Sequence, residues 1–188
     1  MHDDMPGDSQ SSARILRKSG QVEANPWHLS LDSDALPDQR PAIVPLALWQ
    51  ASPRSDQLAP LLDSDVALNQ GLARELLAAP LVAIRFPAFT DGRGYTLARL
   101  LRERYAISGE IRAVGDVLID QLFYMARCGF DAFDLREDQL IENAIKALDT
   151  FSLSYQSVVD IPEPLFARRL RESAAKRHER ERESVPSC

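Results

Sequence analysis

Histidine and cysteine are scarce in this chain, and their scarcity excludes several kinds of catalytic and metal site. The 188 residues include three histidines and two cysteines. His2, His28 and His178 lie outside the predicted core, and neither Cys128 nor Cys188 belongs to a Cys-x-x-Cys pair. One chain therefore cannot supply the four thiolates of an iron–sulfur cluster or a structural zinc site. We expect no metal site and no catalysis by a histidine within the fold.

Long apolar runs and an excess of positive charge are also missing. No segment approaches the roughly 20 apolar residues of a membrane-spanning helix, and the acidic N-terminus lacks the apolar stretch of a signal peptide. The formal net charge is −6, whereas a nucleic-acid-binding surface is basic. We therefore expect a cytoplasmic protein with neither a nucleic-acid nor a membrane partner. No Walker motif or dinucleotide fingerprint is present, so no cofactor is expected.

Short apolar runs alternate with amphipathic segments through the middle of the chain. Residues 81–86 and 109–115 are typical of buried strands, and residues 96–105 and 138–149 repeat apolar side chains at helical spacing. This alternation predicts parallel β-α units with right-handed crossovers. The expected fold is α/β, with repeated β-α units forming a mainly parallel sheet covered by helices. A partial β/α barrel is the alternative.

The remaining elements are predicted from shorter patterns. Residues 43–49 are expected to form a strand, and Pro45 within it favours a sheet edge or a bulge. Residues 55–62 are expected to form a short helix, and residues 66–68 a second strand. Residues 117–128 have the pattern of one helix, ended by the glycine that follows it.

Composition divides the chain into three parts. Residues 1–40 are predicted to be an N-terminal arm, partly disordered, with a small hairpin or extended segment at 15–27. Residues 41–160 are expected to form a single α/β domain. Residues 161–188 form a charged C-terminal tail, for which a solvated helix or a disordered segment is favoured over an RNA- or partner-binding arm.

The first candidate ligand site is the polar turn after the strand 81–86. Asp91, Gly92 and Arg93 precede a helix there, and in α/β proteins the free N–H groups at such a helix start face ligands. Gly92 permits close approach of the backbone. Arg93 offers donors suited to a carboxylate, a phosphate or a sulfur oxyanion. The structural alternative is that Asp91 caps the turn and pairs with Arg93.

The second candidate lies around the strand 109–115. Arg112 interrupts this apolar run, Gly115 and Asp116 follow at its carboxyl end, and Asp120 comes one helical turn later. Two such carboxylates could share a proton, hold a hard cation or pair with arginines. The favoured interpretation is structural, with Asp116 capping a helix and Asp120 paired with Arg93 or Arg112. Under either interpretation a buried Arg112 needs a partner.

Parallel neighbouring strands would bring both turns to the same edge of the sheet. The arginine and aspartate side chains of the two turns should then converge. The catalytic candidates are Asp116 and Asp120, and the candidates for binding an anion or ligand are Asp91, Gly92, Arg93, Arg112 and Gly115.

Cys128 is the third candidate. Arg127 beside it could lower the pKa of the thiol if both side chains point the same way. However, no histidine of the predicted core is available to activate the thiol, and free cysteines are commonly buried. A buried, inert thiol is the favoured interpretation.

Several segments together resemble a bacterial family. They include residues 89–105, 110–118, 120–123 and 127–133, and the resemblance covers roughly residues 41–156. The chain is similar to the domain of unknown function 934 family, whose members are often labelled as oxidoreductases involved in sulfite reduction. Their genes tend to lie beside those for assimilatory sulfite reductase. The resemblance implies a place in sulfur assimilation and cysteine biosynthesis more than a particular reaction.

Three functional hypotheses follow. The leading one is an accessory protein that assists a siroheme sulfite reductase by docking to it, or by binding a sulfur oxyanion or a cofactor. The alternative is a small enzyme in which Arg93 and Arg112 hold an anionic substrate and Asp116 or Asp120 acts as acid or base. The third is a structural partner without a ligand site. Room for a ligand above the glycine turns would favour the first two hypotheses. A cluster closed by its own salt bridges would favour the third hypothesis.

Overall fold

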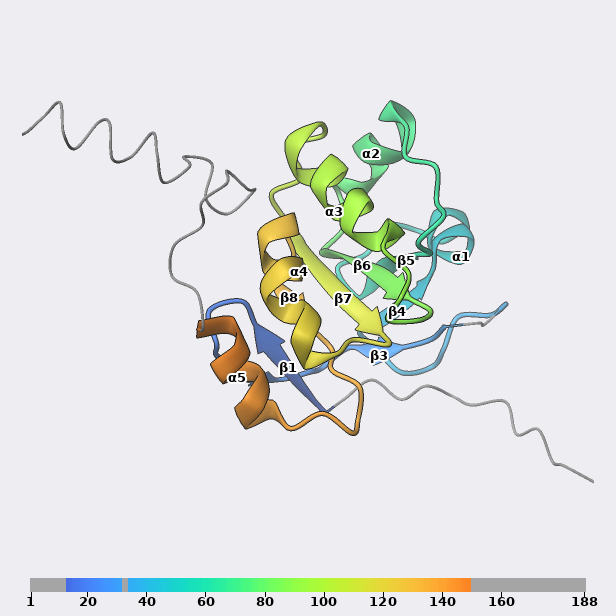
Figure 1. The fold of residues 1–188 in the computed structure, drawn as a ribbon. Helices are drawn as coiled ribbons and strands as arrows, with labels where there is room; N and C mark the ends of the chain where they lie inside the picture. The colour runs from blue at the N-terminus through green and yellow to red at the C-terminus, as the bar shows by residue number, and fades with distance from the viewer. Residues whose placement is uncertain (1–12, 32–33, 150–188) are drawn as a thin grey trace, which may run out of the picture.

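The computed structural model describes residues 13–31 and 34–149, and its centre is one sheet of eight strands (Figure 1). The order across the sheet is β2-β1-β8-β7-β6-β5-β4-β3. From β3 to β8 every strand is parallel to its neighbour, whereas β1 pairs antiparallel with both β8 and β2. The strands are β1 (Arg14–Arg17), β2 (Val22–Ala24), β3 (His28–Leu29), β4 (Ala42–Pro45), β5 (Leu58–Leu62), β6 (Leu81–Phe86), β7 (Glu110–Gly115) and β8 (Ala132–Phe133).

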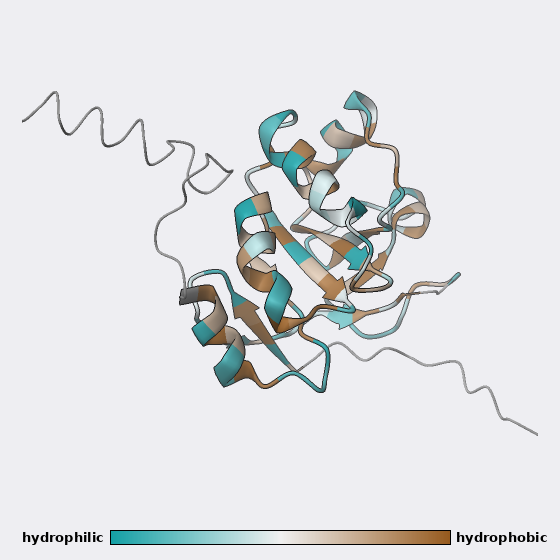
Figure 2. Cartoon of the chain, in the orientation of Figure 1, coloured by the Kyte–Doolittle hydropathy of each residue, from teal (hydrophilic) through white to brown (hydrophobic). Residues whose placement is uncertain are grey.

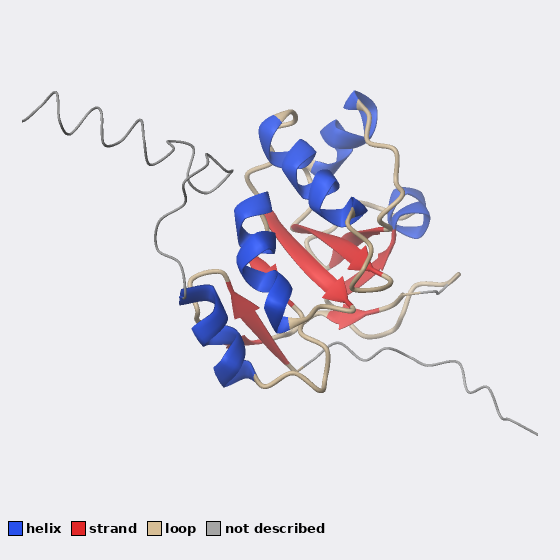
Figure 3. Ribbon diagram, in the orientation of Figure 1, coloured by secondary structure: helices blue, strands red, loops and turns tan. Residues whose placement is uncertain are grey.

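The positions of the helices follow from this order of the strands. Right-handed crossovers between successive parallel strands place each connecting helix on the same face of the sheet, and Figure 3 shows the helices around the outside of the curled sheet. The described helices are α1 (Leu46–Ala51), α2 (Gln70–Leu76), α3 (Arg93–Glu103), the 3-10 helix η1 (Ile119–Gln121), α4 (Leu122–Cys128) and α5 (Ile141–Asp149).

The result is an α/β half-barrel. The predicted α/β class is confirmed, and the curled sheet fits the partial-barrel alternative. The sheet is mixed rather than purely parallel, because the hairpin formed by β1 and β2 adds two antiparallel pairings. The sheet therefore begins at Arg14, next to the segment 15–27 that was expected to form a small hairpin or an extended arm.

The two faces of the sheet bury different clusters, because side chains alternate along each strand. Val82, Ile84 and Phe86 of β6 face the helices and belong to the larger cluster. Leu81 and Ala83 point to the opposite face, where the second cluster is made of strand residues and a short segment around Leu29. Figure 2 shows the central strands as mostly hydrophobic.

Several predicted elements were wrong in type or bounds. Residues 55–62 were expected to form a helix, but 58–62 form the buried strand β5, while 66–68 lie in the loop after it. The expected strand 43–49 divides into the end of β4 and helix α1, so Pro45 ends an internal strand rather than marking an edge. The expected helix 117–128 begins with η1. In residues 43–49 and 55–62 the apolar run is real, but burial on a sheet and burial on a helix look alike over so few residues.

No helix in the described part of the chain combines the length and the apolar character needed to cross a membrane. The predicted tail at 161–188 lies outside the described residues.

Candidate functional site

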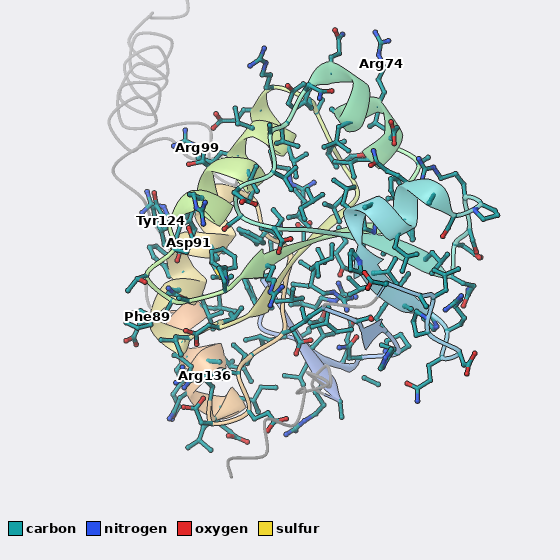
Figure 4. All side chains as sticks on the ribbon, turned by 90° about the vertical axis from the view of Figure 1, so that its right-hand side faces the viewer. Arg74, Phe89, Asp91, Arg99, Tyr124 and Arg136 are labelled. Atoms are coloured by element: carbon teal, nitrogen blue, oxygen red, sulfur yellow. The ribbon has the colours of Figure 1, made fainter. Side chains whose placement is uncertain are left out.

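Four loops meet at the carboxyl edge of the parallel strands, which is where α/β proteins place their ligand sites. They are residues 63–69 after β5, 87–92 after β6, 116–118 with η1 after β7, and 134–140 after β8. Figure 4 places Phe89, Asp91 and Arg136 along one side of the molecule, away from Arg74 of α2. Both polar turns predicted from the sequence lie at this edge.

Asp91 is occupied by groups of the same chain. Its Oδ1 accepts from the backbone N–H of Arg93 at 3.1 Å and from Arg93 Nε at 3.0 Å, and its Oδ2 accepts from Arg93 Nη2 at 2.8 Å. Ser64 donates its hydroxyl to Oδ2 at 2.6 Å. The Asp91 side chain is 12% exposed, whereas that of Arg93 is 60% exposed. The expected structural pairing of Asp91 with Arg93 is therefore formed.

These contacts shift the pKa values of both groups. The hydrogen bonds from Arg93 and then Ser64 hold the pKa of Asp91 well below its usual range, and the same pairing raises the pKa of Arg93. Asp91 is thus a stable carboxylate at neutral pH and is poorly suited to act as a general acid.

Gly115 brings the end of β7 against the end of β6. Its φ is +94°, and a Cβ at this position would lie 2.5 Å from the carbonyl oxygen of Phe86. A side chain is therefore excluded both by the left-handed backbone and by the contact. The next N–H, that of Asp116, donates to the same Phe86 oxygen at 2.8 Å. Gly115 serves this close backbone approach.

Asp116 anchors the β6–α3 loop at Phe89. Its Oδ2 accepts from the Phe89 N–H at 2.8 Å, and Gln121 Nε2 donates to the Phe89 carbonyl oxygen at 2.6 Å. Asp116 Oδ1 in turn accepts from Arg136 Nη1 at 2.7 Å. Both backbone polar groups of Phe89 are satisfied, yet the residue is 53% exposed. Asp116 thus bridges loops rather than capping a helix.

Arg136 completes this network from the loop after β8. It donates through Nε and Nη2 to the two oxygens of Asp138, each at 2.7 Å, in the bidentate geometry of a strong ion pair. Its two carboxylate partners raise the pKa of Arg136, and Arg136 holds the pKa of Asp138 well below its usual range.

Arg112 does not join the other predicted residues. It is 2% exposed, and it donates through Nε to Glu110 Oε1 at 2.7 Å and through Nη1 to Asn25 Oδ1 at 2.9 Å. Glu110 also pairs with Arg17 of β1. The predicted need for a partner is met, but by groups that join β7 to the N-terminal hairpin rather than by Asp116 or Asp120.

Asp120 and Cys128 are the remaining candidates. Asp120 is exposed in η1, and within the described part of the chain it forms no ion pair with Arg93 or Arg112. Cys128 is buried near the end of α4, beside the exposed Tyr124, whose pKa is raised chiefly by the negative charge of the ionised Cys128 sulfur. Over residues 13–31 and 34–149 no group of His, Cys, Asp or Glu side chains is arranged to hold a metal ion.

The carboxyl edge is strongly acidic. Its four loops and adjoining element ends carry eight carboxylates, whereas Arg85, Arg93 and Arg136 are its three guanidinium groups. The loops that enter β5, β6, β7 and β8 (52–57, 77–80, 104–109 and 129–131) carry two residues of each sign. The eight carboxylates of the carboxyl edge are Asp63, Asp65, Asp91, Asp116, Asp120, Asp134, Glu137 and Asp138.

Sequence reasoning missed the residues that complete the two networks. Ser64, Gln121 and Arg136 each follow a strand end or lie in the first turn beyond it. Arg136 could have been predicted from its position, because it lies in the loop after β8 as Asp116 lies in the loop after β7. Ser64 could not be predicted in this way, since the strand before it had been predicted as a helix.

The fold and the edge together define a class: an α/β half-barrel whose carboxyl-edge loops are cross-linked by their own ion pairs. The model of a family described as a bacterial protein of unknown function (DUF934) matches residues 61–166. This match spans more than half of the chain, and the chain belongs to that family. Neither the curated proteins nor the solved structures include a match.

Proposed function

We propose that this chain is an accessory protein of assimilatory sulfite reduction, which assists a siroheme sulfite reductase by docking to it. The chain belongs to a family described as of unknown function, and the pathway is proposed from the labels of the proteins that the sequence resembles, which are oxidoreductases involved in sulfite reduction. The charge pattern at the carboxyl edge favours docking over the binding of a small anion. This pattern is the observation that carries the choice.

A sulfur oxyanion requires positive charge that is free to pair with it. Arg93 is paired with Asp91, and Arg112 with Glu110. The excess of carboxylates at the carboxyl edge raises the electrostatic energy of any small anion placed there. These pairings and charges weigh against anion binding, and equally against an enzyme that holds an anionic substrate through these arginines.

A purely structural partner is the second candidate, because the cluster is closed by its own salt bridges. The exposed Phe89 distinguishes the two candidates. An exposed aromatic ring at this edge suits a docking surface, because aromatic residues are enriched among those that dominate interface affinity, and it adds nothing to a network that only holds the fold.

Deletion of the gene tests the pathway. In a strain with a single copy, we expect slow growth when sulfate or sulfite is the sole sulfur source, and normal growth when cysteine is added. The plasmid-borne wild-type gene is the control and should restore growth on sulfite. Undiminished growth of the deletion strain on sulfite would contradict the proposal.

A further inference from the structure

We infer that Phe89 and the acidic loops around it form the docking surface, and that they receive a basic face of the partner protein with an apolar pocket for the Phe89 ring. The inference rests on the proposed function, because the partner tested is the sulfite reductase. It adds to that function the place of contact and the chemistry of the partner's face.

The first argument is the way in which Phe89 is held. Its N–H and C=O are bound by Asp116 and Gln121, which belong to the next strand end and the helix after it. Asp116 is backed by Arg136 from a third loop. The backbone of Phe89 is thus already ordered and loses little conformational freedom on binding, and aromatic side chains often contribute strongly to the affinity of protein interfaces.

The second argument is charge complementarity. Asp63, Asp65, Asp120, Glu137 and Asp138 are exposed in the loops around this edge. Of the edge's arginines, Arg93 and Arg136 are exposed, and both are already paired with carboxylates. The surface that surrounds Phe89 therefore attracts a basic face and repels nucleic acid.

Two matched pairs of variants test the surface. Phe89→Ser removes the exposed ring, and its control Leu77→Ser removes a side chain that is 58% exposed at the opposite, amino edge of the sheet. Asp120→Lys reverses a charge that no described ion pair uses, and its control Asp56→Lys does the same in the loop before β5. All four positions are exposed, so thermal unfolding of each variant should match that of the wild type.

Surface plasmon resonance supplies the readout, with the full chain flowed over immobilised sulfite reductase holoenzyme from the same organism. We expect Phe89→Ser to raise Kd about tenfold or more and Leu77→Ser to change it less than about twofold. Asp120→Lys should lower the association rate about threefold at low salt, an effect that shrinks as salt is added. Asp56→Lys should leave this rate within error.

The outcomes separate the two proposals. If the wild-type chain does not bind the reductase, the proposed function and this inference both fall. If it binds and the two test variants equal their controls, the proposed function stands and this docking surface is wrong. If Asp120→Lys and Asp56→Lys slow association with the reductase equally, the proposed docking surface is also wrong, because the attraction between the two proteins would then reflect the net charge of the whole chain. Should Phe89→Ser unfold, the charge pair still decides.

Discussion

At the scale of single residues, several carboxylates and guanidinium groups of the carboxyl edge satisfy one another. Asp91 is bound by Arg93 and Ser64, and Asp116 by Arg136 and the Phe89 backbone. An ionised carboxylate with several donors has a lowered pKa, and its contribution to stability is lost when it takes up a proton. Asp91, whose pKa is lowered in this way, therefore makes stability depend on pH in acid solution.

The first prediction concerns Asp91→Asn. Because Arg93 and Ser64 hold the pKa of Asp91 in the folded chain well below that of a free aspartate, the unfolded state takes up a proton first as the pH falls. The contribution of Asp91 is complete above about pH 5 and decreases below it. Urea unfolding should give a lower free energy of unfolding for Asp91→Asn at pH 7, with a gap that narrows between pH 4 and pH 2. A constant gap across this range would contradict the pairing.

A second residue-scale prediction concerns the buried Arg112. Arg112→Met should lower the free energy of unfolding by about 3 kcal/mol, because Glu110 and Asn25 lose a buried partner. The double variant Arg112→Met with Glu110→Leu should recover part of this loss, since the half-buried Glu110 carboxylate is then no longer left without Arg112. Urea unfolding of both variants measures the difference. A loss below about 1 kcal/mol in the single variant would mean that the network does not stabilise the fold.

At the scale of elements, the end of β7 depends on the absence of a side chain at Gly115. Gly115→Ala should cost about 2 kcal/mol or more, because alanine is disfavoured at positive φ and its Cβ would meet the Phe86 carbonyl. Gly109→Ala is the matched control, since nothing lies within 4 Å of a Cβ at that position. Its free energy of unfolding should stay within about 0.5 kcal/mol of the wild type. Equal costs for the two substitutions would show that the close approach at Gly115 is not needed.

The elements also show which parts of the fold could be predicted from the sequence. The strands 81–86 and 110–115 were predictable because each is a continuous apolar run between turn residues. Residues 58–62 were not, since a five-residue run containing a proline carries no periodicity that separates a strand from a helix. Likewise Arg93 and Asp91 were predictable as local neighbours. The partners Glu110 and Asn25 of Arg112 were not, because the sequence does not reveal that β7 packs beside the N-terminal hairpin.

At the scale of the whole molecule, the chain is poor in the cysteines that ligate iron–sulfur clusters. It has two cysteines, and the one in the described residues is buried. We predict that protein purified without oxygen shows no visible absorption band. Stoichiometric flavin or iron–sulfur absorption would contradict this prediction. Free flavin added to the purified protein should likewise not bind, so the spectrum of the protein should stay unchanged after the free flavin is removed.

Docking to sulfite reductase is the central claim, and sedimentation velocity tests it most directly. The siroheme absorbance follows the reductase alone, because the added chain should contribute nothing at that wavelength. We predict that excess chain makes the reductase boundary sediment faster at low salt, and that high salt reverses the shift as charge attraction is screened. A reductase boundary that is unchanged by excess chain at low salt would contradict the account.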